Sequence, residues 1–135
     1  TLDIDVIGQK NSDLSTTIQL MAIAQKLGLP VEAINQAGAF FLYSIKGWEK
    51  ERIIIHRGKG ATFYRPSVNL YCLLKIRRLN ESDLGDCQQY LKFARKHGEK
   101  VDRQKLRRAV QSELKEERVP HRQKRLEQLL VELSK

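Results

Sequence analysis

The sequence predicts an α+β fold in which a small mixed sheet is backed by helices and followed by a helical C-terminal tail. Three observations lead to this prediction. A segment near the start of the chain alternates apolar and acidic residues, as a strand with one apolar face does. Two more strand-like segments flank a glycine-containing connection near the middle. From there to the end, the segments have helical spacing and helix-start residues.

The N-terminal part is expected to begin with a strand over residues 2–7, in which apolar side chains alternate with Asp3 and Asp5. Successive side chains of a strand point to opposite faces, so the two carboxylates share one face. A helix with apolar residues at helical spacing is expected over residues 12–27. Gly28 should end it, because glycine readily takes the left-handed conformation common after helix C-termini.

The middle of the chain is expected to hold a short helix, a buried segment and a hairpin. Pro30 suits the first turn of a helix, so the short helix is placed over residues 31–36. Residues 39–45 are apolar and aromatic, which indicates a buried segment whose type the pattern leaves open. Strands over residues 52–56 and 61–64 flank two glycines, an arrangement typical of a hairpin.

The rest of the chain is expected to be helical. Ser67 is placed to start a helix over residues 68–79, which is apolar almost all round and should therefore be central. Ser82 is the expected cap of the next helix, and Asp102 the cap of the one after it. Pro120 breaks the pattern and starts the last helix, because proline is tolerated in a first helical turn.

The charge distribution suggests a domain over residues 1–98 and a basic helical tail over residues 99–135 that packs on it. The net charge is +9, and residues 94–135 hold 13 lysines and arginines against 7 acidic residues. Such a balance favours acidic partners, including nucleic acids and nucleotides. No apolar run approaches the roughly 20 residues of a membrane span, and no signal peptide is visible. We therefore expect a cytoplasmic protein without a membrane partner.

The two cysteines, Cys72 and Cys87, lie in apolar helical settings. They form no CxxC motif, and no histidine cluster lies near them in the sequence. We therefore expect both to be small buried apolar residues, rather than metal ligands or a disulfide, as is usual in a reducing compartment.

The acidic pair Asp3 and Asp5 is the first candidate site. Two carboxylates on one strand face can bind Mg²⁺ and leave its other positions for triphosphate oxygens. Two such ions can activate an attacking hydroxyl and stabilise a leaving pyrophosphate. Taken alone, the pair fits an exposed strand face with two solvated acids better than a metal site.

A second candidate group combines a lysine with two acids further along the chain. Lys75 lies in the apolar helix, where its side chain either reaches the surface or lies near an anion such as a triphosphate. Asp83 and Asp86 are three residues apart at the start of the next helix, where acids complement the helix dipole. One of the two can also serve as a third carboxylate or orient Lys75.

The basic tail offers candidate contacts to the phosphates of a nucleotide or an RNA. The alternative for these residues is a solvated helix face. The candidates are Arg103, Lys105, Arg107, Arg108, Arg122, Lys124 and Arg125.

Several of these segments follow one another in a familiar order. Residues 1–5 fit the motif T-x-D-[IV]-D, residues 66–75 resemble a P-x-x-L-L-x-x-K helix, and residues 78–86 resemble the R-x-x-R-D-x-x-D-[IL] segment after it. Residues 27–42 are similar to a stretch after the acidic strand. Over residues 1–90 the chain thus resembles the minimal nucleotidyltransferases, and most closely the nucleotidyltransferase toxins of abortive-infection toxin–antitoxin pairs and their uncharacterised bacterial relatives.

The resemblance implies an enzyme that transfers a nucleoside monophosphate from an NTP to an RNA or protein hydroxyl. It implies that Asp3 and Asp5 hold one or two Mg²⁺ ions and that Lys75 contacts the nucleotide. It also implies that Asp86 completes the catalytic site, with Asp83 as the alternative. The partners it implies are the NTP, a tRNA or other RNA, and a cognate antitoxin protein.

The chain departs from the family pattern in two places. The family has a Gly-Gly or Gly-Ser helix start before the acidic strand, whereas nothing precedes Thr1 in this sequence, so weak transferase activity is expected unless an upstream segment supplies that motif. Ser82 stands where a basic residue is expected. One alternative is a non-catalytic module on a decayed transferase fold that binds nucleic acid or a partner. Another is a scaffold protein that uses the leucine stripe of residues 126–133 as a helix–helix interface.

Overall fold

The chain adopts a mixed α+β fold in a computed structural model that describes residues 4–7, 14–35, 37–60 and 62–135. It divides into two compact units, Thr1–Lys46 (unit 1) and Gly47–Lys135 (unit 2), and each is described by itself. Where one small mixed sheet was expected, the described residues form two separate two-stranded sheets, one in each unit.

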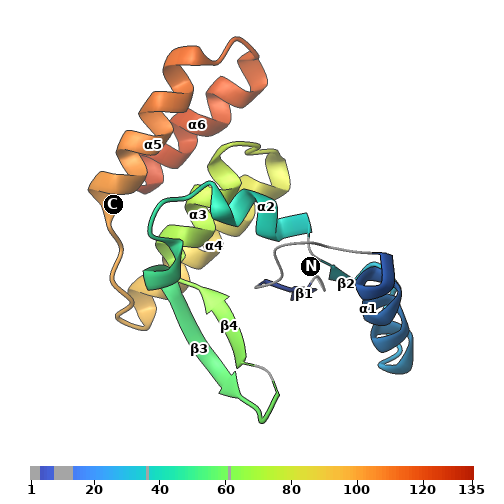
Figure 1. The fold of residues 1–135 in the computed structure, drawn as a ribbon. Helices are drawn as coiled ribbons and strands as arrows, with labels where there is room; N and C mark the ends of the chain where they lie inside the picture. Colours follow the sequence, from blue (N-terminus) through green and yellow to red (C-terminus); the bar gives the residue numbers. More distant parts are fainter. Residues whose placement is uncertain (1–3, 8–13, 36, 61) are drawn as a thin grey trace. The chain divides into compact units, whose positions relative to one another are not determined.

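Unit 1 contains a short parallel strand pair and two helices (Figure 1). Strand β1 (Ile4–Asp5) pairs with β2 (Ile34–Asn35), and helices α1 (Leu14–Lys26) and α2 (Ala37–Tyr43) complete the unit. As expected, α1 is followed by Gly28, two residues after its last residue, with a φ of +67° in the left-handed region. Two parallel strands cannot be joined by a tight turn, and here α1 lies in the connection between them.

Two expectations about unit 1 are wrong. A helix was expected over residues 31–36, but the described part of that range, residues 31–35, is a turn followed by β2. The backbone there is satisfied by β1, since the N–H of Ile4 donates to Ala33 O at 2.7 Å and that of Val6 to Asn35 O at 2.7 Å. The aromatic segment over residues 39–45 is largely helical and is not a buried segment as a whole, because Phe40 is 78% exposed.

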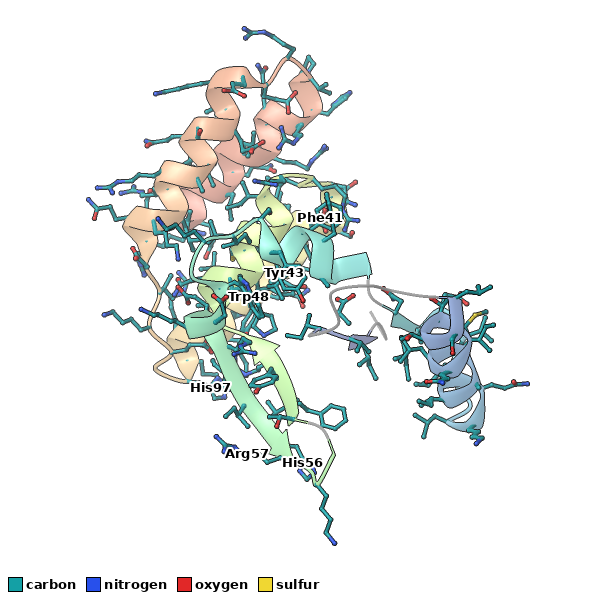
Figure 2. All side chains as sticks on the ribbon, viewed as in Figure 1. Phe41, Tyr43, Trp48, His56, Arg57 and His97 are labelled. Carbon is teal, nitrogen blue, oxygen red and sulfur yellow. The ribbon has the colours of Figure 1, made fainter. Side chains whose placement is uncertain are left out.

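The hairpin predicted near the middle of the chain is confirmed in unit 2. After a 3₁₀ turn, η1 (Trp48–Glu51), strand β3 (Arg52–Arg57) pairs antiparallel with β4 (Thr62–Pro66). Figure 2 shows the labelled side chains of His56 and Arg57 toward the tip of this hairpin. Among the described strands, β3 and β4 pair with each other and with no other strand, so the hairpin forms a two-stranded ribbon that precedes the helices.

Four helices make up the rest of unit 2: α3 (Val68–Ile76), α4 (Glu81–Lys96), α5 (Arg103–Glu116) and α6 (Pro120–Glu132). In Figure 1, α5 and α6 run side by side as a helical hairpin.

Most of the predicted helix starts are confirmed. The Ser67 side chain accepts from Leu70 N, the Asp102 side chain from Lys105 N, and Pro120 opens α6. The cap of α4, however, is Asn80 rather than Ser82. Its side chain accepts from Asp83 N while the Asp83 side chain accepts from Asn80 N, the reciprocal pattern called a capping box. Asparagine is as good an N-cap as serine, so the sequence offered two caps two residues apart.

One buried cluster holds the four helices together, and the tail shares it with α3 and α4. Cys72 and Cys87 are free thiols in this cluster, as expected, and both are buried. The hydrogen bond with Cys72 and burial both raise the pKa of the Cys87 thiol far above its usual range, so the thiol stays protonated. The members of the cluster are Val68, Cys72, Ile76, Leu79, Leu84, Cys87, Leu91, Ala94, Leu106, Val110, Leu126, Leu129 and Leu133.

Within the residues described, we find no helix with the length and apolar character needed to cross a lipid bilayer.

Candidate functional site

The lysine and the two acids singled out on neighbouring helices come together in unit 2. Lys75 is on α3, and its Nζ lies 2.9 Å from Asp83 Oδ1 and 3.3 Å from Asp86 Oδ2 on α4. Asp83 and Asp86 are three residues apart and so lie on one face of α4. The ammonium of Lys75 is mostly enclosed, with a side chain 19% exposed.

Asp83 has no exposed side-chain surface, and both its oxygens are in use. Arg78 donates to it through two nitrogens, each at 2.8 Å, while Lys75 and the backbone N–H of Asn80 supply the remaining bonds. Burial alone would raise the pKa of the Asp83 carboxyl, but the bonds from Arg78, Lys75 and Asn80 outweigh burial and lower that pKa well below its usual range. Asp83 is therefore a buried anion that positions the two cations.

Asp86 is in a different environment, because its side chain is 40% exposed. Its Oδ2 accepts from Lys75 and, at 3.2 Å, from the hydroxyl of Tyr71. A carboxylate has about four acceptor positions, so Asp86 can accept further bonds from a ligand. Of the two acids, Asp86 is the one that can contact a substrate, and Asp83 is the one that fixes the lysine.

Lys75 remains a cation in this setting. Burial alone would lower the pKa of its ammonium, but the hydrogen bond to Asp83 and the neighbouring Tyr71 and Asp86 raise it. Its Nζ also lies 5.5 Å from the centre of the Tyr71 ring, within cation–π distance. A lysine held in this way offers a positive charge beside an exposed carboxylate.

A shallow depression of about 370 Å³ begins at this cluster. Its lining combines aromatic rings with a carboxylate and a carboxamide. The residues are Tyr71, Asp86, Gln89, Tyr90 and Phe93. We call it the aromatic trough.

Three of the trough residues were missed by the sequence analysis: Gln89, Tyr90 and Phe93. The signal was present, since together with Asp86 they lie at positions i, i+3, i+4 and i+7 of α4 and so share one helix face. A stripe at this spacing is ordinarily a core face. Only the fold shows that part of it lines a depression.

In unit 1, Asp5 lies on β1 and is exposed, and Asp3 lies outside the described residues. Asp5 Oδ1 accepts from the backbone N–H of Gly38 at 3.0 Å. Gly38 allows this close approach because a Cβ at that position would lie 2.4 Å from the carboxylate atoms. The carboxylate is thus held in place by backbone, and its second oxygen can still accept a bond or a metal ion.

Of the two predicted metal ligands, Asp3 and Asp5, only Asp5 lies within the described residues. Among the residues described, His, Cys, Asp and Glu side chains form no group of three or more able to hold a metal ion. Asp5 supplies one oxygen ligand of the hard kind that Mg²⁺ prefers, and the other predicted ligand, Asp3, is not described. The residues present fit half of the expected pair.

Four of the seven basic candidates in the tail are used within the protein. Lys105 pairs with Glu51 at 3.0 Å, and Arg107 donates to Ser134 at 2.5 Å. Arg125 donates to the carbonyl of Leu79, a buried residue whose φ of +36° ends the turn after α3. These partners lower the availability of the three side chains for phosphates.

Arg122 is the most occupied of the four. Its guanidinium donates to the carbonyls of Ile76, Arg77 and Arg78 at the C-terminal end of α3, and it forms ion pairs with Glu113 and Glu117. Its side chain is only 17% exposed. Arg122 is therefore a structural residue that satisfies helix-end carbonyls, which have no partner within their own helix.

The other three candidates differ. Arg108 and Lys124 are exposed, and in the described part of the chain neither side chain forms a hydrogen bond or an ion pair. Arg103 is half-buried and lines a narrow crevice with Arg95 and Glu132. Of the seven candidates, Arg108 and Lys124 are therefore the two whose side chains remain fully available to contact phosphates.

Comparisons of this chain with protein-family models, with curated proteins and with solved structures found no match.

Proposed function

We propose that the chain is a Mg²⁺-dependent nucleotidyltransferase that moves a nucleoside monophosphate from an NTP to an RNA or protein hydroxyl, as a component of a toxin–antitoxin pair. The observation that supports the proposal is the meeting of Lys75, Asp83 and Asp86. The resemblance singles out these residues from two separate segments, and their side chains lie within 3.3 Å of the lysine nitrogen.

Each residue has a role that follows from its surroundings. Lys75 carries a positive charge suited to a phosphate of the nucleotide. Asp83 holds Lys75 and Arg78 in position and does not touch substrate, because it has no exposed surface. Asp86 is exposed enough to serve as an acceptor for the reacting hydroxyl or as a metal ligand.

In unit 1, the resemblance assigns metal binding to Asp5 and to Asp3, two residues before it in the sequence. The Gly38 N–H holds the Asp5 carboxylate and leaves one oxygen for a ligand. Mg²⁺, when bound, would neutralise triphosphate charge and make the attacking hydroxyl more acidic.

A binding experiment tests this proposal. Isothermal titration of MgATP, MgCTP, MgGTP and MgUTP into the wild-type chain should give binding that disappears with EDTA. Lys75→Gln and Asp5→Asn should each weaken it at least about tenfold, the loss expected for one charge contact. Lys92→Gln removes an exposed lysine of α4 outside the cluster and is the matched control.

Circular dichroism should first show that each variant is folded, so that a loss of binding can be assigned to the site and not to unfolding. Equal binding by Lys75→Gln and wild type would remove Lys75 from the site. No NTP binding by the wild type in Mg²⁺ would reject the proposal.

A second candidate is a non-catalytic module that binds nucleic acid, favoured by the net charge of +9 and by the unpaired, exposed Arg108 and Lys124. It predicts RNA binding that weakens steeply with salt and does not depend on Mg²⁺. Arg108→Ala and Lys124→Ala should then each reduce the salt slope by about one. Binding of RNA with no NTP binding would favour this candidate over the transferase.

A further inference from the structure

The aromatic trough has the composition of a site for a flat polar ring. Three aromatic side chains, Tyr71, Tyr90 and Phe93, line it together with Asp86 and Gln89. Its volume of about 370 Å³ lies toward the lower end of the range typical of small-molecule sites, roughly 300–1,000 Å³. A site of this size suits one ring system with its sugar better than a large ligand.

Tyr90, the central ring of the aromatic wall, is held in place by hydrogen bonds within the protein. The Tyr90 hydroxyl donates to Pro66 O at 2.7 Å and accepts from Arg65, which is itself paired with Glu99 at 2.9 Å. Glu99 also accepts from the first N–H of α3, that of Val68. Fixed rings bind a planar ligand with little loss of side-chain freedom, which favours affinity.

The rings are arranged edge to face along the trough. Tyr71 and Tyr90 have centroids 5.1 Å apart, and Tyr90 and Phe93 have centroids 5.9 Å apart. Phe93 in turn stacks on His97, labelled in Figure 2, with a centroid distance of 4.0 Å. Even so, Phe93 is 44% exposed, so a large apolar ring remains open to water at the end of the trough.

The polar groups are placed at different points along the same helix face. Asp86 lies at the Lys75 end, and Phe93 lies seven residues further along α4, which corresponds to about 10 Å of helix rise. Gln89 lies between them and is exposed, with one donor and one acceptor group on its carboxamide. The order from one end to the other is cation, carboxylate, carboxamide and aromatic ring.

We propose that the aromatic trough binds the base of the nucleotide, with the base on Phe93 and Tyr90, its polar edge at Gln89, and its phosphates toward Lys75. The inference rests on the proposed function and deepens it by assigning the base-recognition site. Stacking on aromatic rings tolerates any base, whereas a carboxamide pairs with donor and acceptor groups on a base edge. Phe93 therefore sets the affinity for all four nucleotides, and Gln89 sets the preference among them.

The test compares nucleotides with a ligand that has no base. Titrations of the full chain use MgATP, MgCTP, MgGTP, MgUTP and Mg²⁺-tripolyphosphate. Phe93→Ser should weaken the binding of all four nucleotides about tenfold, because it removes a base–aromatic stacking contact of typical strength. Gln89→Leu should bring the four affinities closer together. Neither change should alter tripolyphosphate binding, and Gln88→Leu, the same substitution one residue away and off the stripe, should change nothing.

The outcomes distinguish failure of this inference from failure of the proposed function. Nucleotide binding that Phe93→Ser and Gln89→Leu leave unchanged would overturn the trough assignment while leaving the transferase proposal intact. Equal loss of tripolyphosphate and nucleotide binding in these variants would also overturn it, since the trough would then act on the phosphates or on the fold. Absence of binding for both ligand types in the wild type would overturn both proposals.

Discussion

In unit 2, large apolar side chains from four helices lie in one buried cluster. Among the described residues of unit 1, three of the four buried apolar side chains are alanines, and most of the larger apolar side chains are exposed. Ala24, Ala33 and Ala39 are buried in unit 1, while Ile18 and Leu27 are 56% and 63% exposed. Apolar burial stabilises by about 25 cal/mol per Å², so an alanine contributes much less than a leucine. The two units therefore gain very different stabilisation from their own cores.

The same difference appears in how the candidate site residues are held. Asp83 is fixed by four hydrogen bonds and borders the core of unit 2, whereas for Asp5 the structure shows one hydrogen bond, from a backbone N–H. A residue tied into a core can be lost only with the cooperative unit around it. Changes in unit 2 should thus lower global stability, and changes in unit 1 should remain local.

The largest effect is expected for Asp83→Asn. Removing the charge leaves Arg78 without its anion and Lys75 with Asp86 alone. This should cost about 3 kcal/mol, the lower end for a broken buried pair, because Lys75 keeps one carboxylate and Arg78 is 68% exposed and can be rehydrated. Urea unfolding followed by circular dichroism near neutral pH measures this cost. A loss below about 1 kcal/mol would mean that the cluster does not stabilise unit 2.

The same variant carries a pH prediction. Because the pKa of Asp83 is lowered in the folded chain, its stabilisation is fully present above the unfolded value, near 3.9, and is lost as the pH falls through the folded value. The stability difference between wild type and Asp83→Asn should therefore be constant above about pH 5 and shrink below about pH 4. A difference that grows on acidification would contradict this assignment.

A smaller loss is expected for Arg122→Ala, with Lys124→Ala as its control on the same helix. Arg122 bonds to three helix-end carbonyls, so its removal should cost about 2 kcal/mol. Lys124 is exposed, and its removal should stay within about 0.5 kcal/mol. Thermal unfolding of the two variants checks the difference, and equal melting temperatures would contradict the structural role of Arg122.

The smallest effects are expected from a glycine-to-alanine substitution made once in each unit. This pair of variants compares the two units most directly. Gly38→Ala places a Cβ against the Asp5 carboxylate and should cost about 1 kcal/mol within unit 1. Gly85→Ala meets open space inside α4 and should stabilise unit 2 by about 0.5–1 kcal/mol. Amide hydrogen exchange by residue should show faster exchange confined to unit 1 for the first and slower exchange in unit 2 for the second.

The parts of the fold that the sequence predicted are those that depend on local chemistry. The caps at Ser67 and Asp102, the proline start of α6 and the glycine hairpin all follow from contacts within a few residues. Strand β2 was missed because its only support is the pairing with β1, some thirty residues earlier in the chain. No local pattern distinguishes two paired residues from a turn.

The candidate site was predicted to a similar extent. The grouping of Lys75 with Asp83 and Asp86 followed from motif order. The different roles of the two acids depend on how far the fold buries each side chain: that of Asp83 is fully buried, and that of Asp86 is 40% exposed. The role of Arg122 was missed for the same reason, since its partners are carbonyl groups more than forty residues earlier in the chain. Backbone acceptors carry no signature in a sequence.

The bonds from Arg122 to α3 have a consequence for how the chain is made. A chain emerges from the ribosome N-terminus first, so α3 and Lys75 appear well before Arg122 does. Until α6 has emerged and docked, the carbonyls of Ile76 and Arg77 have only water as a partner. In a nascent chain stopped before α6, the C-terminal end of α3, next to Lys75 in the sequence, would therefore lack the bonds from Arg122.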